Sequence, residues 1–193
     1  STAILNDMTL LGVGSQGAVG TAGGTTTTLG RIGTGFIYAD WNGQITYTTP
    51  NMNGFSASVG IFQPWNAGAL ATGLSDTSSG DTDQFGYQGQ ASYSWTGDFA
   101  GKVWGGFFSQ EVTGLAVGGD ERATAFEAGV SATVANINLV AYGYSGEGVG
   151  TTGLLLDGFD AAGKERDSDG GYVQATYVIP MGTKLGVSYG ISK

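Results

Sequence analysis

Residues 84–96 read Gln-Phe-Gly-Tyr-Gln-Gly-Gln-Ala-Ser-Tyr-Ser-Trp-Thr, and this stretch decides the fold class. Its odd-numbered positions are apolar or aromatic apart from one glycine, and its even-numbered positions are polar or glycine. A period of two places each set on its own face of a β-strand. The stretch therefore predicts a strand with one apolar face and one polar face.

The same alternation recurs along the chain and predicts eight strands in all. It is clear in four further stretches, which are residues 55–61, 122–135, 171–179 and 184–192. It is weaker in three more, which are residues 41–49, 101–111 and 137–145. Short alternating segments bounded by turn residues indicate an all-β chain.

The connections between these stretches alternate in length. Short turns fall near residues 50–54, 97–99, 135–136 and 180–182. Long, acidic, glycine-rich links fall at about 64–83, 112–121 and 146–169. Strict alternation of short and long links predicts an antiparallel up-and-down meander with one trimmed end and one elaborated end. Both a barrel and a soluble sandwich can be built this way.

The composition excludes several classes of function. Of 193 residues, 37 are glycine and 3 are proline, and only 12% are charged. Seven basic against sixteen acidic residues give a net charge of −9, which argues against a nucleic-acid partner because such proteins need a basic face. The chain has no cysteine and no histidine, so thiolate nucleophiles, imidazole bases and the usual zinc sites are absent. We expect no enzyme, no metal site and no cofactor.

No apolar run is long enough for a membrane-spanning helix. The longest ones, such as residues 139–142 and 154–156, are far shorter than the roughly 20 residues required. The chain opens Ser-Thr-Ala-Ile, without an initiator methionine or a basic region. We therefore expect either a processed exported protein or an internal piece of a longer chain.

The chemistry of the two strand faces bears on the surrounding solvent. The polar faces carry Gln, Ser, Thr and small residues with almost no lysine, whereas the water-facing side of a soluble sandwich is usually rich in Lys and Glu. Uncharged polar residues suit a water-filled lumen, and aliphatic and aromatic residues suit lipid. In hydrocarbon, a β-structure must close into a barrel to pair every backbone group. The patterning therefore favours a transmembrane β-barrel over a sandwich.

Two segments resemble the Gram-negative outer-membrane porins. The first runs Thr-Leu-Gly-Arg-Ile-Gly-Thr-Gly-Phe-Ile-Tyr over residues 28–38 and continues over residues 40–55 through Asp-Trp-Asn-Gly to the Asn-Met-Asn-Gly-Phe turn. The second is Arg-Asp-Ser-Asp-Gly-Gly-Tyr-Val-Gln-Ala-Thr-Tyr over residues 166–177, with Gly-Thr-Lys-Leu-Gly-Val-Ser-Tyr over residues 182–189. These segments are similar to a porin's Gly-Arg segment with its hairpin, and to the hairpin that precedes the closing strands.

The resemblance implies a larger barrel than this chain can form. Porins of this kind have about sixteen strands and end in an aromatic residue. This chain has about eight predicted strands and ends Ile191-Ser192-Lys193. We therefore expect residues 1–193 to be a single partial barrel domain from the interior of a larger porin, with its strands over residues 29–193.

The resemblance also implies a pore constriction. The opening residues 4–14 are similar to the inward-folded loop of the family, so residues 1–28 are expected to form that loop. Asp7 is then the acidic residue of the constriction and Arg31 a basic residue of the opposite wall. Opposed charges across a narrow aqueous passage create a transverse field that screens solutes by size and charge. The alternative is that Asp7 caps a helical turn and Arg31 pairs with a loop carboxylate.

Five further side chains are expected to line the pore because the alternation places them on the polar face. They are Glu127, Lys184, Gln88, Gln90 and Gln174. A lysine on the lipid face near the middle of the membrane would cost about 2–4 kcal/mol, which supports the lumen assignment. Lys102 lies near a turn, where snorkelling at the interface is an equal alternative.

Two other groups of residues have a simpler interpretation than a ligand site. The tryptophans and several tyrosines are read as an interfacial girdle, comprising Trp41, Trp65, Trp95, Trp104, Tyr47, Tyr93 and Tyr177, although Trp65 falls in a loop. The acidic loops carry no calcium-binding spacing and are read as an anionic surface at the mouth of the pore.

The sequence thus predicts an outer-membrane porin of a Gram-negative bacterium. We expect a water-filled channel for passive diffusion of small hydrophilic solutes and ions with a mild cation preference. Its expected partners are outer-membrane lipid, lipopolysaccharide and two further copies in a homotrimer. The alternative is a soluble or surface-exposed β-rich binding module, such as an adhesin, whose acidic loops bind calcium or a partner.

Overall fold

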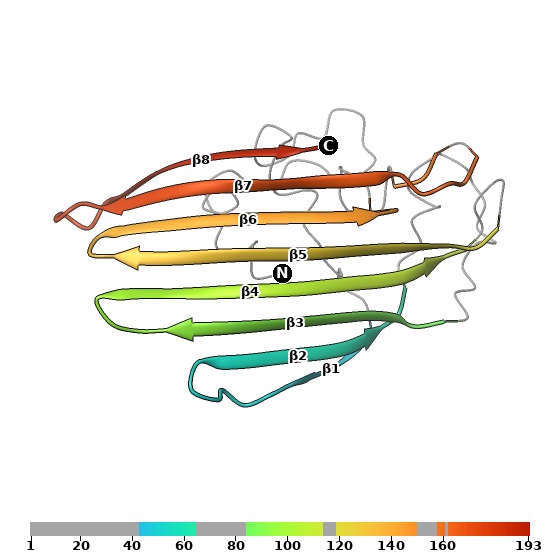
Figure 1. Cartoon of the computed structure of the whole chain (residues 1–193), viewed down its shortest axis with the longest axis horizontal. Coiled ribbons are helices and arrows are strands. Elements are labelled where there is room, and N and C mark those ends of the chain that lie inside the picture. Colours follow the sequence, from blue (N-terminus) through green and yellow to red (C-terminus); the bar gives the residue numbers. More distant parts are fainter. Residues whose placement is uncertain (1–42, 65–83, 114–118, 150–157, 161) are drawn as a thin grey trace.

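The described residues form one eight-stranded antiparallel sheet. The structure is a computed structural model, and it describes residues 43–64, 84–113, 119–149, 158–160 and 162–193. The strands are β1 (Gln44–Thr48), β2 (Phe55–Phe62), β3 (Gly86–Trp95), β4 (Phe99–Val112), β5 (Glu121–Val134), β6 (Ile137–Glu147), β7 (Asp167–Val178) and β8 (Lys184–Ser192). They lie side by side in chain order (Figure 1). The predicted all-β, up-and-down fold is confirmed.

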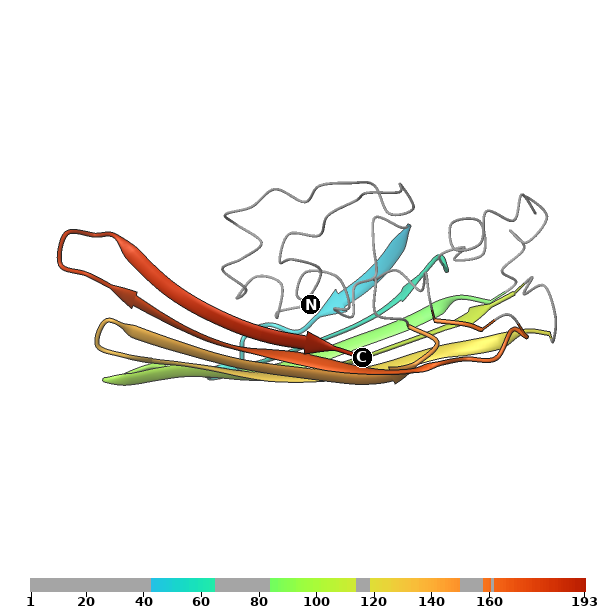
Figure 2. The ribbon, with the colours of Figure 1, turned by 90° about the horizontal axis from the view of Figure 1, so that it is seen from above.

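Within the described residues the sheet is a curved, open layer and does not close on itself. Its two edges are β1 and β8. Figure 2 views the layer from above and shows it bent into a trough. An open, curved meander of this kind is a partial barrel wall. No helix among the described residues is long and apolar enough to cross a membrane.

Tight turns join the strands at one end of the sheet, as predicted. In the β1–β2 turn, Asn53 has φ 53° and Gly54 has φ 95°. Asn and Gly adopt this left-handed conformation readily, and it matches the twist of a two-residue hairpin. The backbones of Met52 and Phe55 bond to each other across the turn, and the Asn51 side chain accepts from the Gly54 N–H at 2.8 Å. The Asn-Gly pair therefore sets the register of the first hairpin.

Strand register separates the side chains into an outer apolar face and an inner, more polar face. Residues directly opposite each other in an antiparallel pair point to the same side. The outer face carries large exposed hydrophobic residues on every strand. From β1 to β8 they include Ile45, Val59, Tyr87, Val103, Val130, Leu139, Val173 and Val187.

The longest strands extend beyond this apolar band. β4 and β5 have 14 residues each, which corresponds to about 46 Å along the strand. The hydrocarbon-facing band of a membrane barrel is only about 25 Å tall. At the end with the long connections the outer face becomes polar, with Glu111 opposite Arg122. The Arg122 guanidinium donates to Ser109 Oγ on β4 and to Gln84 Oε1 just before β3, so it ties three segments together there.

Glycines face aromatic rings across the strands on both sides of the sheet. In five directly opposed pairs, a Cβ added to the glycine would lie 2.1–2.6 Å from the ring. The pairs are Gly86 with Phe62, Gly129 with Trp104, Gly170 with Tyr144, Gly89 with Phe107 and Gly101 with Trp95. Each ring covers the backbone that its glycine leaves bare, an arrangement known to support glycines in sheets. These five glycines are thus required because a larger side chain at each position would clash with the facing ring.

The described part of the β6–β7 connection is held by Asp160 and Phe159. The Asp160 Oδ1 atom accepts from the N–H groups of Ala162 at 2.8 Å and Lys164 at 2.9 Å. Phe159 packs against a cluster at the long-connection end of the inner face, called here the loop-end cluster. The cluster consists of Phe62, Phe108, Val112 and Ala123.

The Gly129 pair makes the steric argument testable. In Gly129→Ala the new methyl would meet the Trp104 ring at 2.1 Å, so the ring must move and we expect a loss of about 1–3 kcal/mol of stability. The control is Gly105→Ala on the next strand, where the nearest atom is Glu127 O at 3.6 Å. The stability of both variants is measured as the midpoint of unfolding in urea. Unfolding is monitored by the loss of heat-modifiable migration in a gel. Equal midpoints for the two variants would refute the role of the ring.

The stability of the loop around Asp160 should depend on pH. The backbone N–H of Lys164 holds the pKa of the Asp160 carboxyl below its ordinary value, with help from the Ala162 N–H and the charges of Arg166 and Lys164. Because the pKa is lowered in the folded loop, the carboxylate stabilises that loop above its ordinary pKa, and this stabilisation is lost as the pH falls through the lowered value. Protection of the Lys164 amide from hydrogen exchange should decrease in the same range.

The matched variants for this loop are Asp160→Ala and Asp160→Asn. The alanine variant should lose the Lys164 protection at neutral pH. The asparagine variant should keep it without the acid transition, because its amide oxygen accepts the same bonds but does not titrate. Protection that persists in the alanine variant would show that other contacts hold the loop.

Candidate pore-facing surface

The inner face collects all the predicted pore-lining residues that belong to described strands. Gln88 and Gln90 lie on β3, Glu127 on β5, Gln174 on β7 and Lys184 at the start of β8. The register places each of them on the same side of the sheet, since Gln90 is opposite Gly106, which is opposite Glu127, and Gln174 is opposite Ser188. Lys102 also lies on this side, opposite Ser131. Their shared face is a finding, and their role in lining a pore remains a prediction.

Glu127 is the most buried charged residue of this face, with 7% of its surface exposed. The Tyr142 hydroxyl on β6 donates to its Oε2 atom at 3.0 Å. Gly106 makes room for the carboxylate, because a Cβ there would lie 3.2 Å from Oε1 and 3.3 Å from Cγ. Three neighbouring strands therefore position this one carboxylate: β5 carries it, β6 binds it and β4 leaves space for it.

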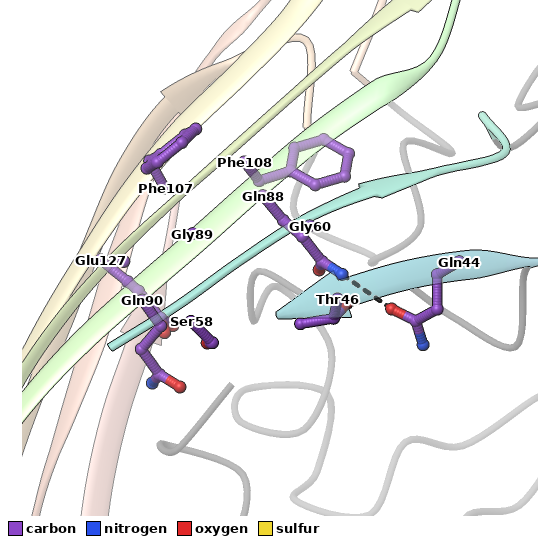
Figure 3. A pocket seen from close by; sticks show the side chains of 11 residues that line it. Gln44, Thr46, Ser58, Gly60, Gln88, Gly89, Gln90, Phe107, Phe108 and Glu127 are labelled. Carbon is purple, nitrogen blue, oxygen red and sulfur yellow. Dashed lines mark hydrogen bonds between the residues drawn. The ribbon is translucent and has the colours of Figure 1, made fainter. Parts of the chain in front are cut away.

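A hollow of about 460 Å³ lies on the inner face beside Glu127. Strands β1 to β5 all contribute to it, which places it on the concave side of the sheet. Its described lining combines five uncharged polar residues with three glycines, two phenylalanines and one glutamate, which are Gln44, Thr46, Ser58, Gln88, Gln90, Gly60, Gly89, Gly106, Phe107, Phe108 and Glu127. The Gln88 amide donates to Gln44 Oε1 at 2.7 Å, joining β3 to β1 over Gly60 (Figure 3). Among the described residues that line the hollow, Glu127 is the charged one.

The inner face also holds aromatic residues, of which the alternation predicts only Tyr172 to lie there. Trp104 and Val140 pack with three tyrosines in a buried group, called here the central aromatic cluster, whose tyrosines are Tyr142, Tyr144 and Tyr172. The ring centroids of Tyr142 and Tyr172 are 5.6 Å apart. In the loop-end cluster, Phe62 stacks on Phe108 at 5.4 Å. The pore-facing surface is thus a polar hollow between two aromatic groups.

The placement of Trp104 in the interfacial girdle is wrong. Its ring lies on the inner face over Gly129, the residue is 2% exposed, and its buried Nε1 atom has no hydrogen-bond partner among the described residues. Trp95 does lie on the outer face, where its ring centroid is 6.3 Å from that of Tyr93 and 6.1 Å from that of Phe99. Trp41 and Trp65 lie outside the described residues.

Charges on the inner face are ordered along the strands. Glu121 lies opposite Val112 at the end with the long connections, and Glu127 lies further along β5. Lys102 and Lys184 lie toward the short turns. Along the described strands, the inner face therefore carries its carboxylates nearer the long connections and its ammonium groups nearer the short turns.

The outer face argues against the alternative of a soluble binding module. A sandwich would cover an apolar face with a second sheet, but the described residues form a single sheet whose apolar side is open to the surroundings. Phe126, for example, is 63% exposed in the middle of this side. An exposed apolar surface that extends over every strand of a sheet is rare on a water-soluble monomer. Lipid is the medium that this face suits.

The remaining site predictions cannot be placed. Asp7, Arg31 and the expected constriction loop at residues 1–28 lie outside the described residues. Within the described ranges, no group of three or more carboxylates could hold a metal ion.

Comparison with known proteins agrees with the resemblance noted from the sequence. No curated protein and no solved structure matches the chain significantly. A family model described as Gram-negative porin matches residues 2–193. This match spans both the described strands and the long connections between them. On that match, and with the up-and-down sheet that the sequence predicts, this chain belongs to the Gram-negative porin family.

Proposed function

We propose that this protein forms a water-filled channel in the outer membrane, through which small hydrophilic solutes and ions diffuse passively with a mild preference for cations. The observation that carries the proposal is the two-faced sheet, apolar outside and polar within its concave side. Porins are channels rather than enzymes, so selectivity depends on the bore and on where charges lie. Asp7 and Arg31 are proposed to face each other at its constriction.

Two observations support the cation preference. The chain carries a net charge of −9, which attracts cations toward the pore mouth. On the inner face, Glu121 and Glu127 precede the lysines for a solute entering from the long-connection end. In bacterial outer-membrane barrels the longer loops face the outside, so external cations would meet these carboxylates first.

The proposed surroundings are those of a trimeric porin. Lipopolysaccharide and other outer-membrane lipids would cover the apolar outer face, and two further copies of the protein would complete a homotrimer. Every strand would then have either lipid or a protein neighbour against its outward side chains. The acidic connections would lie at the external surface.

Planar bilayers test the channel directly. The purified full-length protein should insert in discrete steps of conductance at neutral pH, and a salt gradient across the bilayer should give a reversal potential of the sign expected for cation preference. Bilayers that conduct nothing would overturn the channel. A reversal potential of the opposite sign would overturn the cation preference alone.

Adjacent positions on β8 test which face meets lipid. Val187 is 69% exposed on the outer face, so Val187→Lys should cost about 2–4 kcal/mol of stability in lipid by placing an ammonium group in hydrocarbon. Ser188 points inward, and Ser188→Lys should change the stability by only about 0.5 kcal/mol. Urea unfolding from lipid vesicles compares the two. A larger loss for the Ser188 variant would reverse the assignment of the faces.

A further inference from the structure

We propose that Arg122 and the two hydroxyl groups beside it bind a phosphate group of lipopolysaccharide on the outer face of the sheet. This inference rests on the proposed function, because it takes the outer face to meet lipid and the long connections to face outward. It goes further by assigning a lipid headgroup to particular residues. The occupant is the phosphorylated sugar anchor of lipopolysaccharide, whose acyl chains would cover the apolar residues nearer the short turns.

The first argument is the level of Arg122 along its strand. It is exposed, and it lies on the same face of β5 as the exposed side chains of Phe126, Val130 and Val134. Positions 122 and 134 are twelve residues apart, which is about 40 Å along a strand and about 30 Å across a membrane at the usual tilt. The apolar band of a barrel is only about 25 Å tall. With Val134 at the short-turn edge of this band, Arg122 lies at the level of the lipid headgroups beyond its other edge.

The second argument is the way the guanidinium group is held. Arg122 donates to Ser109 Oγ at 3.3 Å and to Gln84 Oε1 at 3.4 Å, and both of these acceptors are uncharged. The two bonds fix the orientation of the group and use two of its five N–H donors. A guanidinium group with donors to spare binds a phosphate through two oxygens at once. Glu111, directly opposite Arg122, offers an acceptor to the hydroxyl groups of the attached sugar.

The third argument is the pair of hydroxyl groups next to the arginine. Ser109 and Thr124 are directly opposite each other on the outer face, two positions nearer the short turns than Glu111 and Arg122. Their side-chain oxygens are 3.3 Å apart. Since each hydroxyl carries one hydrogen, one hydrogen joins the pair and the other can be donated to a phosphate oxygen. The site therefore combines a guanidinium group with a neighbouring hydroxyl donor.

The fourth argument is charge complementarity across the outer face. Glu147 and Asp167 lie on this face at the same end of the sheet, directly opposite each other on β6 and β7. Their carboxylates would repel a phosphate. The bonds of Arg122 to Ser109 on β4 and to Gln84 before β3 direct its guanidinium group away from them. The charges therefore favour an anion over β3 to β5 and not over β6 and β7.

The fifth argument is the surface between this polar site and the short turns. Phe107 and Phe126 are directly opposite each other there, and both are exposed. Tyr87, also exposed, lies opposite Ser109 on the β3 side. Tyrosine is enriched at membrane interfaces, where its ring contacts apolar groups and its hydroxyl contacts headgroups. A molecule with a phosphate at one end and acyl chains at the other matches this order along the strands.

Lipid A, the phosphorylated anchor of lipopolysaccharide, and its dephosphorylated form are the probe pair. Each is fluorescently labelled and titrated with the purified full-length protein in detergent micelles, and binding is measured by fluorescence polarisation. A chelator is present, so divalent cations do not bridge the phosphates to carboxylates. The wild-type protein should bind lipid A about tenfold more tightly than the dephosphorylated form, as a charge-assisted hydrogen bond provides. Unlabelled phosphatidylglycerol, which is anionic but lacks the sugars, should displace lipid A less readily than unlabelled lipid A does.

The variant that tests the site is Arg122→Gln, which removes the charge and should abolish the tenfold preference for lipid A. The matched control is Arg166→Gln, which removes the same charge from an exposed arginine in the β6–β7 connection. The control should retain the preference. Heat-modifiable migration in a gel checks that both variants are folded. Channels of the Arg122→Gln variant should conduct like the wild type, because the residue lies on the outer face.

Four results would overturn the inference. The wild-type protein could bind both forms of lipid A equally, which decides the matter without any variant. The Arg122→Gln protein could retain the full preference. Both glutamine variants could lose it together, which would assign it to overall charge. Phosphatidylglycerol could displace lipid A as well as lipid A itself does, which would make the site one for any anionic lipid. The binding assay uses no ion current, so its failure is distinguishable from absence of conductance, which would overturn the channel function.

Discussion

The pairing of backbone amides and carbonyls between neighbouring strands is the constraint on which the rest of this structure depends. Hydrocarbon offers these groups no water, so each strand must bond to a strand on both sides. Strands β2 to β7 meet this demand in the simplest order, each between its two neighbours in the chain, while β1 and β8 form the edges of the described sheet. Since side chains alternate with a period of two, the same pairing divides them between two solvents. A slip of one residue would exchange the faces, placing Glu127 in lipid and Phe126 in the pore.

Strand spacing imposes a second constraint, because neighbouring strands lie only about 4.8 Å apart. A tryptophan or tyrosine cannot lie flat along the sheet unless the facing position is small. Gly129 under Trp104 and Gly170 under Tyr144 meet this requirement in the central aromatic cluster. Gly106 does the same for a carboxylate, since Glu127 lies over it while Tyr142 binds from the other side. The pore-facing surface is therefore shaped as much by missing side chains as by those present.

The strands, their order and the division into two faces could be predicted from the sequence, because alternation is local and a single stretch such as residues 84–96 displays it. The arrangement within the inner face could not. Strand β4 carries aromatic residues on both faces, which weakened its alternation and led to the wrong placement of Trp104, and β6 carries Tyr142 and Tyr144 on the face that the pattern predicts to be polar. The contact of Tyr142 with Glu127 joins residues 15 apart in sequence, and it follows only once the β5–β6 register is known. The alternation could have revealed part of it, because Tyr142 and Tyr144 lie an even number of residues from the polar Asn138 and therefore share its face of the strand.

Each glycine and the ring that covers it share a fixed space, and this constrains how the two positions can change during evolution. Because a larger residue at position 129 would meet the Trp104 ring, we expect the two positions to change together more readily than either changes alone. The same holds for the other four opposed pairs. Relatives of this chain should therefore exchange the members of a pair across the two strands, with the aromatic residue moving to the partner strand. Such exchanges would preserve the packing between the strands and change the shape of the surface that a passing solute contacts.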